Sequence, residues 1–562
     1  MFIDLRRHDA GSPIETDVCI IGGGAAGITL ALEFNKHPFR TCLIESGGFR
    51  PNAPTQDLYR GESVGLPYEF SDGCRTRYFG GSSNCWGGWC RPMEEEDFAQ
   101  REWVPNSGWP FAKSELVPYY ERTQDMLKLA SGHFDTDSWI EAIGSSEVRK
   151  IPFVTGRVVD GISQFSPPVR FGKLYRAELA KSKKVSVYIY ANAIDLQTDG
   201  SQTVRRLKVK TLSGREVTVA AKVFILAAGG IENARLLLAS NGDWPSGLGN
   251  QNDLVGRYFM DHPRLFSGRI RFRGNWARNL LYDFKYHYHN KEIAAHGTCV
   301  AAQFALAPAV RANEKLLNAR VCFSSVLPGE ESRAAEILLR TRKRFRGREE
   351  TSHSLAQDML ALAARPVDAT SFILAHYLNL RSLIRHSRFQ IIVEPAPDPE
   401  SRVTLSQQRD RLGMNRVRVD WRLGNSVKRT FDRTLAIVAE ELALADVADV
   451  DLDPSIESGS WPKTFEKEGT FHHMGTTRMH DSAKQGVVDR NCRLHGTNNL
   501  YVAGSSVFPT AGANFPTITI VALAQRLADH IGALMATSAA EIASEPAESG
   551  RYPIGLTQAQ PR

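Results

Sequence analysis

The sequence has no run of 18 or more apolar residues, which is the length that a helix needs to cross a membrane. An apolar stretch is also missing after Arg6-Arg7, where a signal peptide would carry one. The sequence therefore predicts neither a membrane span nor a signal peptide, and we expect a cytoplasmic protein.

Closely spaced cysteine pairs are lacking as well. The eight cysteines contain no C-x-x-C, and the closest two, Cys85 and Cys90, have no accompanying histidine pattern. Such spacing favours reduced thiols over disulfides or a zinc site. We expect no metal site.

The chain has little excess of positive over negative charge. The net charge is +7 over 562 residues, and no basic stretch alternates with aromatic residues as nucleic-acid-binding segments do. Solenoid-type repeats are also absent. A chain of this length exceeds one typical core, so we expect two or more domains.

The stretch TDVCIIGGGAAGITLALEF carries the first positive signal. An apolar strand, Val18–Ile21, precedes Gly22, Gly24 and Gly27 at G-x-G-x-x-G spacing, and a helical pattern follows. This arrangement lets a diphosphate approach free N–H groups at a helix N-terminus. Glu45 ends a second apolar strand 21 positions after Gly24, where an acid can bind a ribose hydroxyl. The unit predicts FAD or NAD rather than NADP.

Two later segments repeat the strand–glycine–helix order. Val223–Ala227 leads into Gly229-Gly230 and a helical stretch, and LYVAG leads through a turn into a helix at Ile518–Ile531. We therefore expect a dinucleotide-binding domain that is interrupted and resumed along the chain. Alternating patterns in 266–330 predict a sheet for a second domain.

Two stretches leave alternatives open. Residues 75–93, RTRYFGGSSNCWGGWCRPM, are either a loop packed by its own tryptophans or a loop laid along a flavin ring. Residues 331–388 are Arg-rich and helical, and form either solvated helices or a surface that binds an anionic membrane.

Five segments together resemble the glucose–methanol–choline (GMC) FAD-dependent oxidoreductases: CIIGGGAAG with Glu45, FGGSSNCWGG, AAGGIENARLLL, VGRYFMDHP and NNLYVAGSSVFPTAGANFPT. HHMGTTRM, QFSPPVRF and NFPT are most similar to the bacterial sugar-oxidising branch, near pyranose 2-oxidase and the glycoside 3-oxidases. The resemblance implies an α/β fold (α+β overall). It consists of a Rossmann-like FAD-binding domain, an antiparallel-sheet substrate-binding domain and a helical insertion.

The predicted boundaries follow from these segments. We expect the FAD-binding domain in 1–105, 183–264 and 486–537, and the substrate-binding domain in 106–182 and 265–485. The helical insertion occupies 331–388, and a flexible tail follows at 538–562.

The resemblance also implies the cofactor contacts. Its motif positions in this sequence are Gly22, Gly24, Ala25, Ala26, Gly27, Glu45, Ser46, Gly80, Gly81, Ser82, Ser83, Asn84, Cys85, Ala193, Ala228, Gly504, Ser505, Asn514, Pro516 and Thr517. Cys85 stands where pyranose 2-oxidase has a histidine attached covalently to its flavin. That link is excluded here, and we expect FAD to bind non-covalently rather than through Cys85.

The implied catalytic pair is His472 and Asn514. An imidazole can take the hydroxyl proton while hydride leaves the alcohol carbon, and an amide can hold the same oxygen. In an extended segment His473 would face away from His472. For His262, His480 and His495 we expect structural roles, while Gln164 and Arg170 are candidates for substrate contact.

These residues predict FAD-dependent oxidation of a CH–OH group, on a secondary hydroxyl of a sugar or glycoside. One alternative is a GMC-type dehydrogenase acting on a non-sugar alcohol, with a quinone or cytochrome rather than O₂ as electron acceptor. Another is a non-catalytic flavin-binding protein. The sequence leaves the oligomeric state undetermined.

Overall fold

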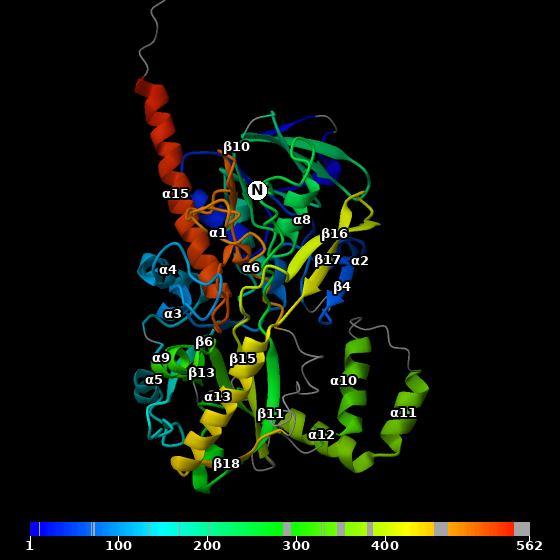
Figure 1. Cartoon of the computed structure of the whole chain (residues 1–562). Coiled ribbons are helices and arrows are strands. Elements are labelled where there is room, and N and C mark those ends of the chain that lie inside the picture. The colour runs from blue at the N-terminus through cyan, green and yellow to red at the C-terminus, as the bar shows by residue number, and fades with distance from the viewer. Residues whose placement is uncertain are drawn as a thin grey trace, which may run out of the picture.

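The computed structural model describes residues 1–562 except 10–11, 69, 71–73, 133, 168, 201, 285–293, 327–328, 331, 346–353, 379–385, 454–469 and 545–562. Two large sheets, one above the other in Figure 1, organise the described chain. The upper sheet carries the N-terminal glycine turn, and the lower sheet lies across a cavity from it.

The upper, nucleotide-type sheet has the strand order β1-β7-β3-β2-β10-β9-β8, and β19 also pairs with β10. Its pairs are parallel except β10–β9 and β9–β8. The central strands end in apolar runs, Val18–Ile21 in β2 and Val223–Leu226 in β10, as expected for parallel strands that are covered on both faces. Their bounds are β1 Phe2–Asp4, β2 Ile14–Ile21, β3 Thr41–Ile44, β7 Val185–Ile189, β8 Asn192–Thr198, β9 Val204–Lys210, β10 Glu216–Leu226 and β19 Leu500–Val502.

Helices cover this sheet from both sides. Helices α1 (Ala25–Phe34) and α15 (Thr517–Ser544) pack together on one side of β10, and α8 (Glu232–Ala239) lies on the other (Figure 1). Since α1 follows β2 and α15 follows β19, the two ends of the sequence meet in one layer. This layer is the Rossmann-like part of the predicted fold.

The lower sheet is antiparallel, with the order β18-β11-β15-β14-β13-β6-β5 and β12 beside β13. Helix α13 (Asn425–Leu444) crosses it (Figure 1). The strands are β5 Trp89–Cys90, β6 Val158–Phe165, β11 Arg264–Phe272, β12 Ala294–Ala295, β13 Thr298–Leu306, β14 Ala319–Val326, β15 His386–Val393 and β18 Ala448–Asp451. A smaller sheet joins β4 (Gly61–Gly65), β16 (Arg402–Arg409) and β17 (Asn415–Trp421).

The predicted fold class is confirmed, including its helical insertion. Three helices, α10 (Arg333–Phe345), α11 (Leu355–Ala363) and α12 (Pro366–Leu378), stand to one side of the lower sheet (Figure 1). The insertion ends before residue 388, because β15 already begins at His386. The domain boundaries stay a prediction, and β5 of the lower sheet falls inside the predicted range 1–105.

The remaining helices are short connections. They are α2 Ala53–Gln56, α3 Glu95–Phe98, α4 Val117–Leu127, α5 Thr136–Ile143, α6 Phe171–Leu174, α7 Arg176–Lys181 and α9 Pro308–Glu314.

The C-terminal helix is longer than the sequence predicted. It continues to Ser544, beyond the expected start of the tail at residue 538, and the rest of that tail lies outside the described residues. By length and composition alone, Thr517–Thr537 could cross a membrane. However, 61% of its most apolar window is buried inside the protein, where α1 and α4 pack against it. A buried core helix passes the same test, so this is weak evidence for a span.

Candidate functional site

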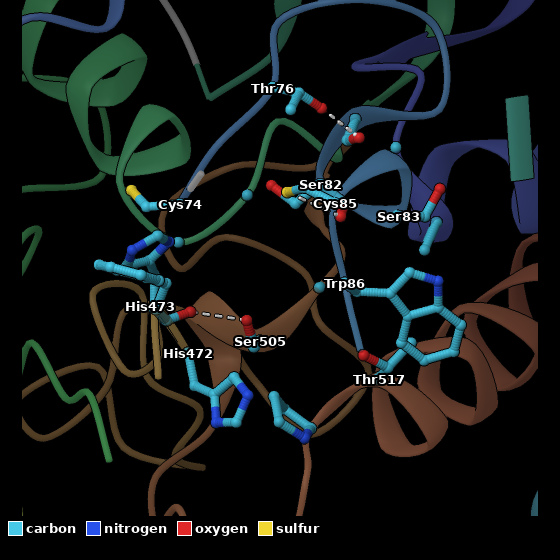
Figure 2. A pocket seen from close by; sticks show the side chains of 18 of the residues that line it. Cys74, Thr76, Ser82, Ser83, Cys85, Trp86, His472, His473, Ser505 and Thr517 are labelled. Atoms are coloured by element: carbon cyan, nitrogen blue, oxygen red, sulfur yellow. Dashed lines mark hydrogen bonds between the residues drawn. The ribbon is translucent and has the colours of Figure 1, made fainter. Parts of the chain in front are cut away.

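A cavity of ≈ 730 Å³ separates the two sheets. Its walls include the β2–α1 turn, the loop around residues 81–89, the segment 470–473, the turn 504–505 and the upper face of the lower sheet. In Figure 2, Ser82, Cys85 and Trp86 lie across from His472 and His473. This volume is within the range of ligand pockets in proteins.

The β2–α1 turn forms one end of the cavity. Gly22 has φ +114°, and a Cβ atom there would lie 2.5 Å from the Ala227 carbonyl oxygen. A Cβ on Gly27 would lie 1.9 Å from the Gly22 oxygen, so this glycine is needed for helix packing and does not itself line the cavity. Helix α1 begins after Gly24 with no side-chain cap and no acid in its first turn. Its free N–H groups therefore fit a diphosphate.

Glu45 lines the same end and is almost fully buried. Its carboxylate accepts hydrogen bonds from the backbone N–H groups of Gly23 (2.9 Å) and Gly47 (2.7 Å). Burial raises the pKa of Glu45, and these two donors act in the opposite direction. A carboxylate has about four lone-pair sites, so Glu45 can still accept from a ribose hydroxyl.

An ion-pair cluster that the sequence did not reveal lies beside this end. Glu232 pairs with Arg75 (3.2 Å), Arg77 (3.0 Å) and Arg235 (3.3 Å), and Arg235 also pairs with Asp410 (2.7 Å). Burial alone would raise the pKa of Glu232, but the three guanidinium groups bring it down to about 2. Because these five residues carry three positive and two negative charges, the cluster retains one net positive charge near the predicted diphosphate position.

Most of the predicted cofactor residues line the cavity. They are Gly22, Gly24, Ala25, Ala26, Glu45, Ser46, Gly81, Ser82, Ser83, Cys85, Ala193, Ala228, Gly504, Ser505, Pro516 and Thr517. Gly27, Gly80, Asn84 and Asn514 do not line it. Gly80 has φ +106° and begins the short helical turn Gly81–Asn84, and the Asn84 amide donates to the Phe79 carbonyl (3.2 Å). Gly80 and Asn84 therefore stabilise the backbone conformation of the loop and do not face the cavity.

His472 lines the cavity, and its ring forms a hydrogen bond that was not predicted. Its Nδ1 lies 2.9 Å from Nδ1 of His262, and Nε2 of His262 lies 2.8 Å from the Gly512 carbonyl oxygen. Burial lowers the pKa of His262 to about 4, and burial followed by the nearby His262 and His473 lowers that of His472 well below its usual value. Both rings are therefore neutral at pH 7.

The Gly512 carbonyl determines the tautomers of both rings. A carbonyl can only accept, so His262 carries its proton on Nε2 and presents an unprotonated Nδ1. His472 must then donate from Nδ1, which leaves its Nε2 with a free lone pair. No described residue forms a hydrogen bond with that Nε2. His262, expected to be structural, thus prepares His472 to accept a proton.

Asp261 holds the backbone on either side of this pair. It accepts hydrogen bonds from the His472 backbone N–H (2.8 Å) and the Thr470 hydroxyl (2.7 Å). The carboxyl is fully buried, and burial raises its pKa to about 6 despite these donors. The VGRYFMDHP motif therefore supplies two neighbouring residues, Asp261 and His262, that orient His472.

His473 also lines the cavity, contrary to the alternation expected for an extended segment. The preceding Phe471 has φ +58°, which breaks the extended backbone on which that expectation rested. Ser505 donates to the His473 carbonyl (2.6 Å; Figure 2). The ring Nε2 is buried without a hydrogen-bond partner among the described residues, and burial lowers the pKa of His473 to about 3. The neutral ring packs against Tyr68 and Phe259, so this nitrogen is not open to the cavity.

Asn514 does not line the cavity, so the structure does not present it there together with His472, and the catalytic pair stays a prediction. The side-chain oxygen of Asn514 accepts from Nε of Arg320 (3.0 Å), and its amide donates to the Pro92 carbonyl (2.7 Å). These two partners turn the side chain away, and Phe515 lines the cavity instead. Asn514 anchors the turn that contains Gly512.

The two substrate-contact candidates also lie outside the cavity. Gln164 is fully buried, and its amide bonds with both backbone groups of Ala130. Arg170 donates to the carbonyl groups of Ser83 (3.0 Å) and Trp86 (2.8 Å). It therefore supports the loop from behind.

The lower sheet contributes wall residues that no local motif marks. They are Arg264, Phe266, Ser324, Arg388, Gln390 and Ile392, joined by Phe284 from a loop, while Trp89 of the same sheet belongs to the glycine-rich stretch 75–93. The only sequence signal for these residues is that they occupy alternate positions along their strands, which places them on one face of a sheet. No group of three or more His, Cys, Asp or Glu in the described part of the chain could hold a metal ion.

Comparisons with known proteins show which family and which solved structures the chain resembles. Residues 397–524 match the family model described as GMC oxidoreductase. The chain is 25% identical over 581 residues to 6'''-hydroxyparomomycin C oxidase of Streptomyces lividus, covering 92% of each. It is 25% identical over 377 residues to the fructose dehydrogenase large subunit of Gluconobacter japonicus, covering 66% of this chain but only 59% of that protein.

Solved structures share the fold. Formate oxidase of Aspergillus oryzae aligns over 94% of this chain and 100% of its own, with a TM-score of 0.54 and 17% identity. Pyridoxine 4-oxidase of Mesorbium loti aligns over 92% and 99%, with a TM-score of 0.51 and 18% identity.

Proposed function

We propose that this GMC oxidoreductase, an FAD-dependent enzyme that acts on alcohols, oxidises a secondary hydroxyl of a sugar or glycoside with His472 as base. The hydrogen-bonded chain from Gly512 through His262 to His472 carries the proposal. It leaves an unprotonated Nε2 on a ring that lines the cavity.

The residues that would hold FAD are distributed along the cavity. The N-terminus of α1 would bind the diphosphate, and Glu45 the ribose. Ser82, Ser83, Ser505 and Thr517 would flank the flavin ring. When bound, FAD supplies the acceptor for the hydride that leaves the alcohol carbon.

The chain's own residues handle the proton. Nε2 of His472 takes the hydroxyl proton, so the C–H bond can break as the carbonyl forms. The positive charge that develops on His472 is stabilised because its Nδ1–H donates to the neutral His262. Asp261 holds the His472 backbone in place meanwhile.

The composition of the wall supports a sugar as substrate. Trp89, Phe284 and Phe515 provide aromatic surface, while Ser324 and Gln390 provide a few hydrogen-bonding groups. Sites for polar organic ligands combine these two features. The names of the related fructose dehydrogenase and hydroxyparomomycin C oxidase agree with this class.

Anaerobic flavin reduction tests the proposal. The purified holoenzyme is mixed with a panel of free sugars, glycosides, aminosugars and simple alcohols, and the absorbance near 450 nm is followed. Bleaching by a sugar or glycoside is the expected result. Bleaching by simple alcohols alone would overturn the substrate class, and no bleaching at all would favour a non-catalytic flavin protein.

FAD is proposed to bind without a covalent bond. Cys85 lines the cavity, and its thiol lies 3.4 Å from the Ser82 carbonyl oxygen. Acid precipitation of the holoenzyme should therefore release all the FAD into the supernatant, as it should for Cys85→Ser. Flavin retained in the pellet of the wild type but not of the variant would reveal a cysteinyl link.

His262 is expected to control the rate through the tautomer of His472. His262→Phe removes the acceptor of the Nδ1–H and should slow flavin reduction roughly 5- to 150-fold, corresponding to a lost buried hydrogen bond of about 1–3 kcal/mol. His262→Gln retains an acceptor and should recover part of the rate. FAD content and circular dichroism serve as controls for folding. Equal rates in the wild type and His262→Phe would contradict the role.

The pH dependence follows from the lowered pKa of His472. A lowered pKa means that the neutral, proton-accepting ring persists to lower pH. The rate constant of flavin reduction should therefore stay constant from pH 8 down past 6.5, the usual value for histidine, with the acid limb below it. Stopped-flow measurements between pH 5 and 9 check this, and a limb centred above pH 7 would disagree.

A second candidate concerns the electron acceptor. The helical insertion exposes Met359 (57%), Leu360 (76%) and Val367 (76%), and residues 331–385 contain ten Arg and Lys against six Asp and Glu. An apolar, basic surface favours a dehydrogenase that delivers electrons to a quinone at an anionic membrane. Turnover with O₂ is compared with turnover with a short-chain quinone, with and without anionic vesicles. Fast turnover with O₂ and no effect of vesicles would exclude it.

A further inference from the structure

Three neighbouring strands of the lower sheet present alternate side chains to the cavity. Opposite residues are Phe266 and Gln390 on β11 and β15, and Ser324 and Arg388 on β14 and β15. Since side chains alternate along a strand, Arg388, Gln390 and Ile392 share one face, and all three line the cavity.

Arg388 is half-buried, yet it lacks the ion pairs that the buried Arg101 and Arg235 form. Arg101 pairs with Glu394, and Arg235 pairs with Glu232 and Asp410. Arg388 forms no ion pair or hydrogen bond in the described part of the chain, and its Nε is buried without a partner. The guanidinium group stacks on Phe266, with its central carbon 4.3 Å from the centroid of the phenyl ring.

A cation withdrawn from water without a counter-charge costs free energy. Stacking on Phe266 orients the planar guanidinium but does not neutralise it. Two other charged side chains line the cavity, Glu330 and Arg264, which lies opposite Ile392, and both have interactions of their own. With two cations and one anion, this wall has an excess of positive charge.

The position of Arg388 indicates which part of a substrate it would contact. His472 contacts the Phe515 ring, with centroids 5.9 Å apart, and Phe515 packs in one cluster with Ile392. Arg388 precedes Ile392 by four residues on β15, which is roughly 13 Å along a strand. Arg388 therefore lies toward the end of the cavity remote from the reacting carbon.

We infer that Arg388 is the centre of an anion-binding subsite, and that the substrate is a glycoside with a carboxylate or phosphate on the unit distant from the oxidised hydroxyl. This inference rests on the proposed function, because it specifies the class of sugar. A planar guanidinium binds either oxyanion in a bidentate manner. Ser324 and Gln390, on the same wall, can hydrogen-bond to the neighbouring hydroxyl groups.

Binding to the oxidised holoenzyme tests the subsite without depending on turnover. Calorimetry compares two matched pairs: lactose with lactobionate, and trehalose with trehalose 6-phosphate. At least one anionic member should bind about 10-fold more tightly than its neutral partner, and added NaCl should reduce this difference. Preference for only the carboxylate or only the phosphate would identify the oxyanion.

Variants assign the preference to one residue. Arg388→Gln should abolish the preference for the anionic member of each pair, while Arg388→Lys should keep part of that preference. Arg269→Gln is the matched control, because Arg269 is exposed on the neighbouring β11 and does not line the cavity. FAD content confirms that each variant is folded.

The outcomes separate the two proposals. Equal affinities for charged and neutral sugars, or a preference that survives in Arg388→Gln, would overturn the subsite. Anionic preference without flavin reduction by any sugar would leave the subsite in place and overturn the proposed sugar oxidation.

Discussion

His472→Ala is expected to slow anaerobic flavin reduction by about 10²–10⁴-fold while FAD remains bound. The variant removes the only nitrogen that the Gly512–His262 chain leaves unprotonated toward the cavity. The α1 N-terminus and Glu45, which we propose bind the diphosphate and the ribose of FAD, lie elsewhere in the cavity and are untouched. Stopped-flow absorbance gives the rate, and the absorbance ratio of flavin to protein gives the FAD content.

Two further histidine variants sharpen this result. His473 lines the same cavity but forms no hydrogen bond with His262. The variant His473→Ala should therefore change the affinity or the spectrum of the flavin more than its rate of reduction. His480→Ala lies away from the cavity wall and should leave the rate unchanged. A full loss of rate in His473→Ala together with an active His472→Ala would exchange the roles of the two residues.

Gly27→Val is expected to produce a protein that neither folds stably nor retains FAD. Even a Cβ atom at this position would lie 1.9 Å from the Gly22 carbonyl oxygen, so α1 would have to move away from the β2–α1 turn. Displacement of packed backbone of this kind destabilises proteins by about 1–3 kcal/mol or more, and the valine γ-carbons add to it. Thermal unfolding and bound FAD are the two measurements.

Gly24→Ala is the matched comparison within the same motif. No atom lies within 4 Å of a Cβ built on Gly24, so the apoprotein should fold with an unchanged melting temperature. The added methyl would face the diphosphate position and should weaken FAD binding alone. Gly242→Ala, also with open space around its Cβ, should change neither property. Equal loss of stability in Gly24→Ala and Gly27→Val would show that packing does not distinguish the two glycines.

Local spacing accounts for the parts of the site that the sequence predicted. Gly22, Gly24 and Glu45 lie within about 25 residues, and the strand–turn–helix geometry follows from their order. Four loop residues, Gly81, Ser82, Ser83 and Cys85, and the turn 504–505 likewise line the cavity where their motifs suggested. Each of these segments is continuous in sequence, so its local backbone conformation depends mainly on its own residues.

Side-chain direction at the catalytic end did not follow from spacing. Asn514 has the residue type that its motif requires, yet Arg320 and Pro92 hold its amide away from the cavity. His473 faces the cavity because Phe471 takes a left-handed conformation. The direction of Asn514 depends on contacts with segments more than a hundred residues away, and that of His473 on one unusual dihedral angle. A periodic sequence pattern predicts neither of them.

By itself the sequence determined the nucleotide-type sheet, the FAD end of the cavity and His472 as a candidate base, because these depend on local order and composition. Only the tertiary structure decided what surrounds that base. His262 is 210 positions from His472, and Gly512 is 250 positions from His262. Arg388 meets Phe266 only because β15 pairs with β11. Hydrogen bonds and charge burial act over a few ångströms in space, whatever the separation along the chain.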